Sequence, residues 1–136
     1  MQLFQSEFSS KEEKVLPRTK NIAAGIGMIY ILLTLLCSFL LYLTGLNSFD
    51  SIAHGMTIIA TGGFSTKDMS IGYFDSIYTE IVTMFFMIIA SLPFIYLFQA
   101  MKGKFTDLLK SSQVQFFLLI ILISTIIVAF WLKRYY

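Results

Sequence analysis

Three long stretches without a charged residue constrain the fold of this chain more than any other feature. Residues 21–49 form a run of 29 uncharged residues, residues 81–101 a run of 21, and residues 111–132 a run of 22. About 20 apolar residues in an α-helix cross the ~30 Å hydrocarbon core of a bilayer. With 57% hydrophobic and only 13% charged residues, the composition also differs from that of a soluble domain. The sequence therefore predicts an all-α integral membrane protein with three transmembrane helices.

A fourth uncharged run, residues 51–66, is too short to cross a bilayer, because it has 16 residues and is interrupted by three glycines. Asn47 is a capping candidate for a short helix over residues 49–60. Residues 61–66 would then follow as non-helical backbone, which is tolerated at membrane depth only where it is buried in protein or lines water. We therefore expect a re-entrant segment.

The distribution of Lys and Arg predicts the orientation in the membrane. With a re-entrant segment after the first crossing, seven of the ten basic residues fall on one side. They are Lys11, Lys14, Arg18, Lys20, Lys102, Lys104 and Lys110, against Lys67, Lys133 and Arg134 on the other side. Since basic residues accumulate on the cytoplasmic side, we expect a cytoplasmic N-terminus and a re-entrant loop that opens to the outside.

The string Thr61-Gly62-Gly63-Phe64-Ser65-Thr66 is the part of the sequence that carries chemistry. A cation that enters a membrane exchanges its hydration shell for oxygen ligands, and successive backbone carbonyls can supply them. Glycine accepts backbone angles that other residues avoid, so it allows carbonyls to turn toward one axis. The C-terminal end of the preceding short helix would add a modest attraction for a cation. Taken alone, Gly62-Gly63 would more often be a loop hinge or a close helix contact than a filter, and the surrounding string favours the filter.

This string, with Asp68 and Ser70-Ile71-Gly72-Tyr73-Phe74 downstream, closely resembles the filter region of one repeat in the Trk/Ktr potassium transporter superfamily, of the TrkH/KtrB type. Further matches lie before the string. They are Met1-Gln2-Leu3-Phe4, Leu16-Pro17-Arg18, and Ser48-Phe49-Asp50 with His54. The resemblance extends over the whole chain and is most specific at the filter string.

The resemblance implies a role in potassium transport. Members of this superfamily consist of four fused helix–pore loop–helix units around one pore. Each unit contributes one filter strand with a key glycine. Gly63 matches that glycine, and Thr61, Gly62 and Phe64 would supply the neighbouring filter backbone. Potassium would be held by backbone oxygens of Thr61, Gly62 and Gly63, with no cofactor and no covalent catalysis. Only one such filter string is present, so the chain corresponds to one repeat.

The resemblance also implies surroundings and partners. We expect a multi-pass protein of the cell (inner) membrane, in contact with lipid and with the remaining pore repeats of a parent chain. Expected partners are a cytosolic nucleotide-binding regulatory subunit of the TrkA/KtrA type and a second copy of the full-length subunit, as a homodimer. A net charge of +2, clustered in short stretches, does not suggest binding to nucleic acid.

On this interpretation the chain has three parts. Residues 1–20 form a cytoplasmic linker, and residues 102–136 form a cytoplasmic connection with the first helix of a following repeat. Residues 21–101 form the helix–pore loop–helix repeat. Its segments are a helix over 22–44, a pore helix over 49–60, a filter over 61–66 and a helix over 77–101, which Pro93 is expected to kink.

Single residues around the filter string allow structural and functional interpretations. His54 could be proton-sensitive, but a hydrogen-bonded packing role is favoured. Lys67 places a positive charge next to the filter, which Asp68 and Asp75 could offset. Cys37 lies in an apolar run and is expected to pack as a small hydrophobic residue.

Two other functions remain open from the sequence. Four copies of the chain could form an independent homotetrameric cation channel, each copy donating one filter strand, although the third helix disfavours this. The chain could also be a non-conducting membrane scaffold or a remnant of a transporter. The residues do not distinguish potassium selectivity from mixed passage of potassium and sodium.

Overall fold

The computed structural model describes residues 2–101, 103 and 105–135. Met1, Lys102 and Lys104, which enter the expectations above, lie outside the described residues. The described part of the chain consists of helices and connecting segments without a strand, which confirms the predicted all-α class. It divides into two compact units, of which the first ends at Phe94 and the second begins at Ile95.

The first unit is built on a long helix, α1, which runs Gln2–Leu43. Its part Thr19–Leu43 is long and apolar enough to cross a membrane, with a mean hydropathy of 2.4. The helix also covers residues 2–20, for which the sequence analysis expected a linker. Residues 2–16 contain no glycine or proline and are rich in good helix formers, so nothing in them ends the helix.

A tight turn leads from α1 into the short helix α2, Ser48–Ile59. Gly45 has a φ of 104°, a value that glycine adopts readily after a helix end. Asn47 caps α2, since its side-chain oxygen accepts a hydrogen bond of 2.8 Å from the backbone N–H of Asp50. With 12 residues, α2 is about 18 Å long and cannot cross a bilayer.

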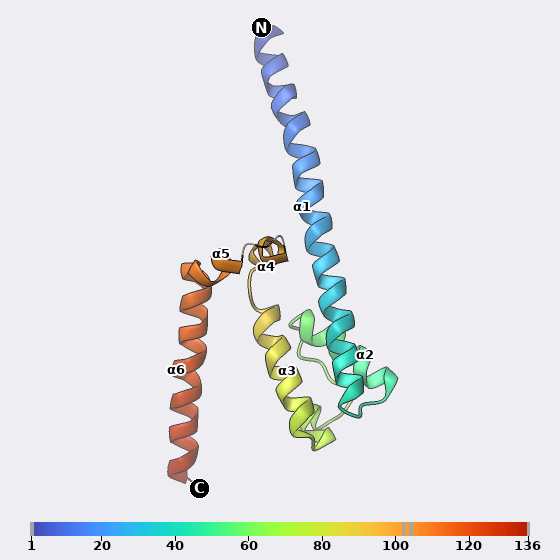
Figure 1. The fold of residues 1–136 in the computed structure, drawn as a ribbon, viewed down its shortest axis with the longest axis vertical. Coiled ribbons are helices and arrows are strands. Elements are labelled where there is room, and N and C mark those ends of the chain that lie inside the picture. Colours follow the sequence, from blue (N-terminus) through green and yellow to red (C-terminus); the bar gives the residue numbers. More distant parts are fainter. Residues whose placement is uncertain (1, 102, 104, 136) are drawn as a thin grey trace. The chain divides into compact units, whose positions relative to one another are not determined.

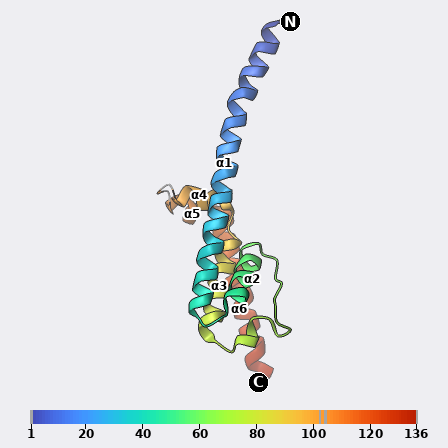
Figure 2. The ribbon, with the colours of Figure 1, turned by 90° about the vertical axis from the view of Figure 1, so that its right-hand side faces the viewer.

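After α2 the chain reverses its direction and returns beside this helix. Figure 1 shows α2 next to the C-terminal part of α1. Figure 2 shows that the chain turns back at the end of α2 and returns beside this helix as an irregular segment. The return leads into a 3-10 helix, η1, Ser70–Phe74, and then into α3, Ile77–Ala90, which Ser76 caps.

The helix after the return segment is interrupted near its end. α3 ends at Ala90, and α4, Phe94–Met101, begins after three intervening residues. Pro93 lies in the break, and its nitrogen carries no hydrogen that could donate to a carbonyl one turn earlier. The hydroxyl of Ser91 donates to the carbonyl of Met87 at 2.8 Å and so occupies one acceptor at the end of α3.

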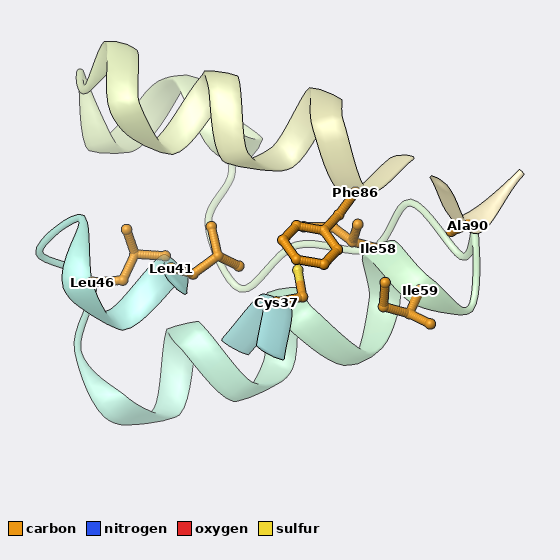
Figure 3. Close-up of a cluster of buried hydrophobic side chains, with 7 residues drawn as sticks. All are labelled: Cys37, Leu41, Leu46, Ile58, Ile59, Phe86 and Ala90. Carbon is orange, nitrogen blue, oxygen red and sulfur yellow. The ribbon is translucent and has the colours of Figure 1, made fainter. Parts of the chain in front are cut away.

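The core of the first unit lies between α1, α2 and α3. Its buried apolar side chains are Cys37, Leu41, Leu46, Ile58, Ile59, Phe86 and Ala90. Figure 3 shows the ring of Phe86 beside Cys37 and Ile58, so all three helices meet at this point. Cys37 is fully buried with a free thiol and packs as a small hydrophobic residue, as predicted.

The second unit contains α4, α5 (Phe105–Lys110) and the long helix α6 (Ser112–Tyr135). The side-chain amide of Gln115 donates to the carbonyl of Leu109 at 3.0 Å and ties the start of α6 to α5. The part Ser112–Arg134 is long and apolar enough to cross a membrane, with a mean hydropathy of 2.6. The described helices therefore offer two spans, or three if α3 and α4 together form one broken span.

Candidate functional site

The segment that follows α2 leaves the helical conformation at two residues with positive φ. Thr61 has a φ of 52° and Gly63 a φ of 71°. For Thr61, a β-branched residue, this region of φ is unfavourable and is maintained only where the surrounding structure fixes it. The N–H of Gly62 donates to the carbonyl of Thr57 at 2.8 Å, which closes the last turn of α2.

The two glycines of the segment are required for different reasons. A Cβ at Gly63 would have no atom within 4 Å, so the positive φ, and not lack of space, favours glycine there. A Cβ at Gly62 would lie 3.0 Å from Oγ1 of Thr57 and 3.3 Å from the ring of Phe64, so space is limited at that position. Gly63 is therefore the position where the backbone angle itself demands glycine.

The carbonyl groups of this segment are free to bind. In the part of the chain that the structure describes, no hydrogen bond is donated to a carbonyl oxygen of residues 61–64. These residues are exposed in the single chain, and the side chain of Phe64 is 80% exposed. Since backbone carbonyls normally find a donor, such a group of them is suited to water or to a cation.

Three side chains on one face of α2 hold the returning segment. Thr57 accepts a hydrogen bond of 2.9 Å from the N–H of Phe64 through its Oγ1. His54 bonds to the hydroxyl of Ser65 at 2.9 Å, and Asp50 accepts a hydrogen bond from Thr66. Positions 50, 54 and 57 are four and three residues apart, so they lie above one another on the helix. We call these three connections the ladder.

The contact of His54 with the backbone of its own helix fixes the tautomer of the neutral ring. Its Nδ1 lies 2.8 Å from the carbonyl oxygen of Asp50, which can only accept, so Nδ1 carries the hydrogen. Neutral Nε2 is then an acceptor, and the hydroxyl of Ser65 donates to it. The Ser65 oxygen in turn accepts from the N–H of Lys67 at 3.1 Å. This hydrogen-bonded and buried placement agrees with the packing role predicted for His54.

The end of the ladder nearest the start of α2 is charged. Nζ of Lys67 lies 3.1 Å from Oδ2 of Asp50, whose side chain is only 3% exposed. The hydrogen bond from Thr66, together with Lys67 and the amide of Asn47, holds the pKa of Asp50 below its usual range, although burial acts in the opposite direction. Nζ of Lys67 also lies 5.1 Å from the centre of the Tyr73 ring.

The partner of Lys67 differs from the expectation. The sequence analysis offered Asp68 and Asp75 as groups that could offset its charge, whereas the ion pair forms with Asp50, 17 positions earlier. The sequence analysis named Asp50 only in the match Ser48-Phe49-Asp50 and assigned no role to Thr57 or to the side chain of Ser65. The signal that could have found the ladder is the spacing of polar residues 50, 54 and 57 on a short helix whose other residues are mostly apolar.

A cavity of about 300 Å³ borders the candidate filter. Three of the four predicted site residues line it, namely Thr61, Gly63 and Phe64. Thr83 and Met87 of α3 also line this cavity, so the candidate filter and α3 border the same space.

Comparisons with known proteins agree with the resemblance noted above. The Trk system potassium uptake protein TrkI of Halomonas elongata is 36% identical over 132 residues, which cover 96% of this chain and 27% of that protein. For the protein TrkH of Escherichia coli K12, also named a Trk system potassium uptake protein, identity is 38% over 106 residues, or 76% of this chain and 22% of that protein. The chain thus spans about a quarter of the length of these relatives.

No solved structure was found to match the chain. The family model of TrkH, described as a cation transport protein, matches residues 1–132. This match covers nearly the whole sequence, and the relatives named above share more than a third of their aligned residues with it. The chain therefore belongs to the TrkH family of cation transport proteins.

Proposed function

We propose that the chain contributes one strand of a potassium-selective filter to a Trk-type uptake system. The observation that carries this proposal is the set of unpaired carbonyls at residues 61–64, exposed on a re-entrant segment beside a short helix. Backbone oxygens of Thr61, Gly62 and Gly63 bind the ion, and Phe64 continues the filter backbone. The names of the relatives, which are potassium uptake proteins, support potassium as the ion.

The ladder supports the same function. Oxygen ligands discriminate between cations only if their positions are maintained against the pull of the ion, and a free loop does not maintain them. Here three side chains of α2 tie Phe64, Ser65 and Thr66 to a helix that packs in the core. The filter segment is therefore supported along its outer part.

The proposal includes an arrangement in the membrane. The N-terminus of α1 lies in the cytoplasm, the turn between α1 and α2 lies outside, and the filter opens outward. Because the chain spans about a quarter of its relatives, further pore repeats complete the pore. A nucleotide-binding regulatory subunit in the cytosol and a second full-length subunit complete the system.

The test is a pair of glycine substitutions in the complete transporter that contains this chain, expressed in bacteria that lack their own potassium uptake. Gly63→Ala forces a Cβ onto a residue with a φ of 71°, so the carbonyl positions shift. Gly72→Ala is the matched control, because its φ is not positive and a Cβ there meets no atom within 4 Å. Uptake of K⁺ is measured with and without competing Na⁺.

We expect Gly63→Ala to lower the preference for K⁺ over Na⁺ by about tenfold, and Gly72→Ala to leave it unchanged. Equal ratios for the wild type and both variants would show that Gly63 lies outside the filter, and the proposal would be wrong.

A further inference from the structure

We propose that His54 is a positioning residue that sets the ion preference of the filter through the hydroxyl of Ser65. This inference rests on the proposed function, since it assigns a role in selectivity to a residue outside the filter string. His54 does not touch the ion. It acts on the backbone immediately after Phe64.

Two contacts hold the ring of His54 besides its bond to Ser65. Nδ1 donates to the carbonyl of Asp50 at 2.8 Å on its own helix, and the edge contact with the ring of Phe74 has a centroid distance of 5.5 Å. The residue is 2% exposed. The ring therefore cannot rotate or swing without losing a hydrogen bond or a packing contact, and Nε2 occupies a fixed point in the structure.

Ser65 connects the fixed Nε2 atom of His54 to the backbone of the filter segment. Its hydroxyl donates to Nε2 of His54 at 2.9 Å and accepts from the N–H of Lys67 at 3.1 Å. Both the donor and the acceptor capacity of the hydroxyl are used, and the direction of each hydrogen bond follows from the neutral His54 tautomer. The backbone of Ser65 is thus held at a set distance from α2, one residue after the last filter carbonyl.

The neighbouring connections prevent the segment from adjusting elsewhere. Thr57 holds the N–H of Phe64 on one side of Ser65, and Asp50 holds Thr66 on the other. A change in length of the middle connection must therefore displace the backbone between two held points. The carbonyls of residues 61–64 precede this region directly, so their spacing depends on the bond between His54 and Ser65.

Two amide substitutions of His54 separate its two hydrogen bonds. In His54→Gln, the longer side chain places an acceptor near the former Nε2 and retains the bond to Ser65. In His54→Asn, the shorter side chain retains a donor near the former Nδ1, directed to Asp50, and does not reach Ser65. Both variants have an uncharged amide but differ in length, so substitutions of Ser65, which leave the packing of the His54 ring in place, are measured beside them.

The experiment measures the ratio of K⁺ to Na⁺ uptake for these variants in the complete transporter. We expect His54→Gln to keep the wild-type ratio and His54→Asn to lower it by roughly fivefold, the effect of losing one hydrogen bond. Ser65→Ala should lower the ratio to the same extent as His54→Asn. Ser65→Thr keeps a hydroxyl and should keep the wild-type ratio. The double variant with His54→Asn and Ser65→Ala should be no worse than either single variant.

Controls separate this inference from the proposed function. Ser124→Ala removes a hydroxyl that donates only within α6, to Ile121 at 2.9 Å, and should leave the ratio unchanged. If Gly63→Ala lowers the ratio but His54→Asn and Ser65→Ala do not, the positioning role is wrong and the filter proposal stands. If none of the three changes the ratio, the filter proposal itself fails. Where a His54 variant does not reach the membrane, the Ser65 pair decides by the same criterion.

Discussion

Nζ of Lys67 lies 3.1 Å from Oδ2 of Asp50, so the residue that follows the candidate filter is ion-paired to the first turn of α2. The side chain of Asp50 is 3% exposed, and that of Lys67 is 28% exposed. A buried carboxylate depends on its partners, because an unpaired charge in such a place is strongly unfavourable. The pair therefore ties the C-terminal end of the candidate filter to the helix beside it.

The first prediction concerns Lys67. Lys67→Gln removes the positive partner and leaves the carboxylate of Asp50 with its hydrogen bonds from Thr66 and Asn47 only. We expect a lower apparent melting temperature of the detergent-solubilised transporter, measured by the loss of the monodisperse peak after heating. Lys67→Arg keeps the charge and should stay close to the wild type. Equal melting temperatures for Lys67→Gln and the wild type would contradict a stabilising ion pair.

The second prediction concerns the pH dependence of stability. The pKa of Asp50 is lowered in the folded chain, first by the hydrogen bond from Thr66 and then by Lys67 and Asn47. A carboxyl group with a lowered folded pKa stabilises the fold fully above its unfolded value of about 3.9, and this contribution is lost as the pH falls through the folded pKa. The contribution of Asp50 should thus be constant from about pH 5 to pH 7 and should decline below about pH 4.

Melting temperatures of the wild type and of Asp50→Asn at a series of pH values measure this contribution. The difference between the two proteins should be largest near neutral pH and should shrink on acidification below about pH 4. Asp68→Asn is the matched control, since Asp68 is exposed and its substitution should change the melting temperature little. A difference for Asp50→Asn that grows toward low pH would have the wrong sign for this explanation.

The third prediction concerns the contact between α1 and α2. A Cβ at Gly55 would overlap Oγ of Ser38 and would lie 3.0 Å and 3.1 Å from the backbone N and Cα of Ser38. Gly55→Ala should therefore push the helices apart and destabilise the fold by about 1–3 kcal/mol, the usual range for overpacking. The measurement is thermal or chemical denaturation in detergent. Ser38→Gly in the same chain should recover part of the loss, because it removes the overlapping side chain.

Gly27→Ala is the control for this substitution. Gly27 lies in α1, and a Cβ there meets no atom within 4 Å. Alanine has the higher helix propensity, so this variant should be neutral or slightly stabilising. If Gly55→Ala were as well tolerated as Gly27→Ala, the close approach of α1 and α2 at Ser38 would be wrong.

The sequence predicted those features that depend on local patterns. Uncharged runs and the match around residues 61–66 indicated an all-helical membrane protein of this family, and the fold class and the family are both confirmed. Asn47, proposed as a capping candidate, caps α2. Such features can be predicted from the sequence because a helix cap and an apolar run each depend on one continuous stretch of residues.

Contacts between residues that are distant in the sequence could not be predicted from such local patterns. Lys67 has two carboxylates nearby in sequence, yet it pairs with Asp50, because the return of the chain beside α2 places position 67 next to position 50. The ladder depends on the same return. The start of α1 could not be predicted either, since a charged stretch of good helix formers is compatible with both a linker and a helix. Pairings of this kind follow from the path of the chain and not from composition.

The last prediction concerns Thr57, the innermost connection of the ladder. Its Oγ1 is the acceptor for the N–H of Phe64 at 2.9 Å. Thr57→Val keeps the shape of the side chain and removes the acceptor, so the amide of Phe64 loses its partner and the backbone of the candidate filter is no longer held at this point. We expect a roughly fivefold lower ratio of K⁺ to Na⁺ uptake, which corresponds to the loss of one hydrogen bond. Thr57→Ser keeps the hydroxyl and should retain most of the wild-type ratio. A Thr57→Val transporter with wild-type selectivity would show that the hydroxyl of Thr57 is not needed to hold the segment, because the remaining connections from His54 and Asp50 would then be sufficient.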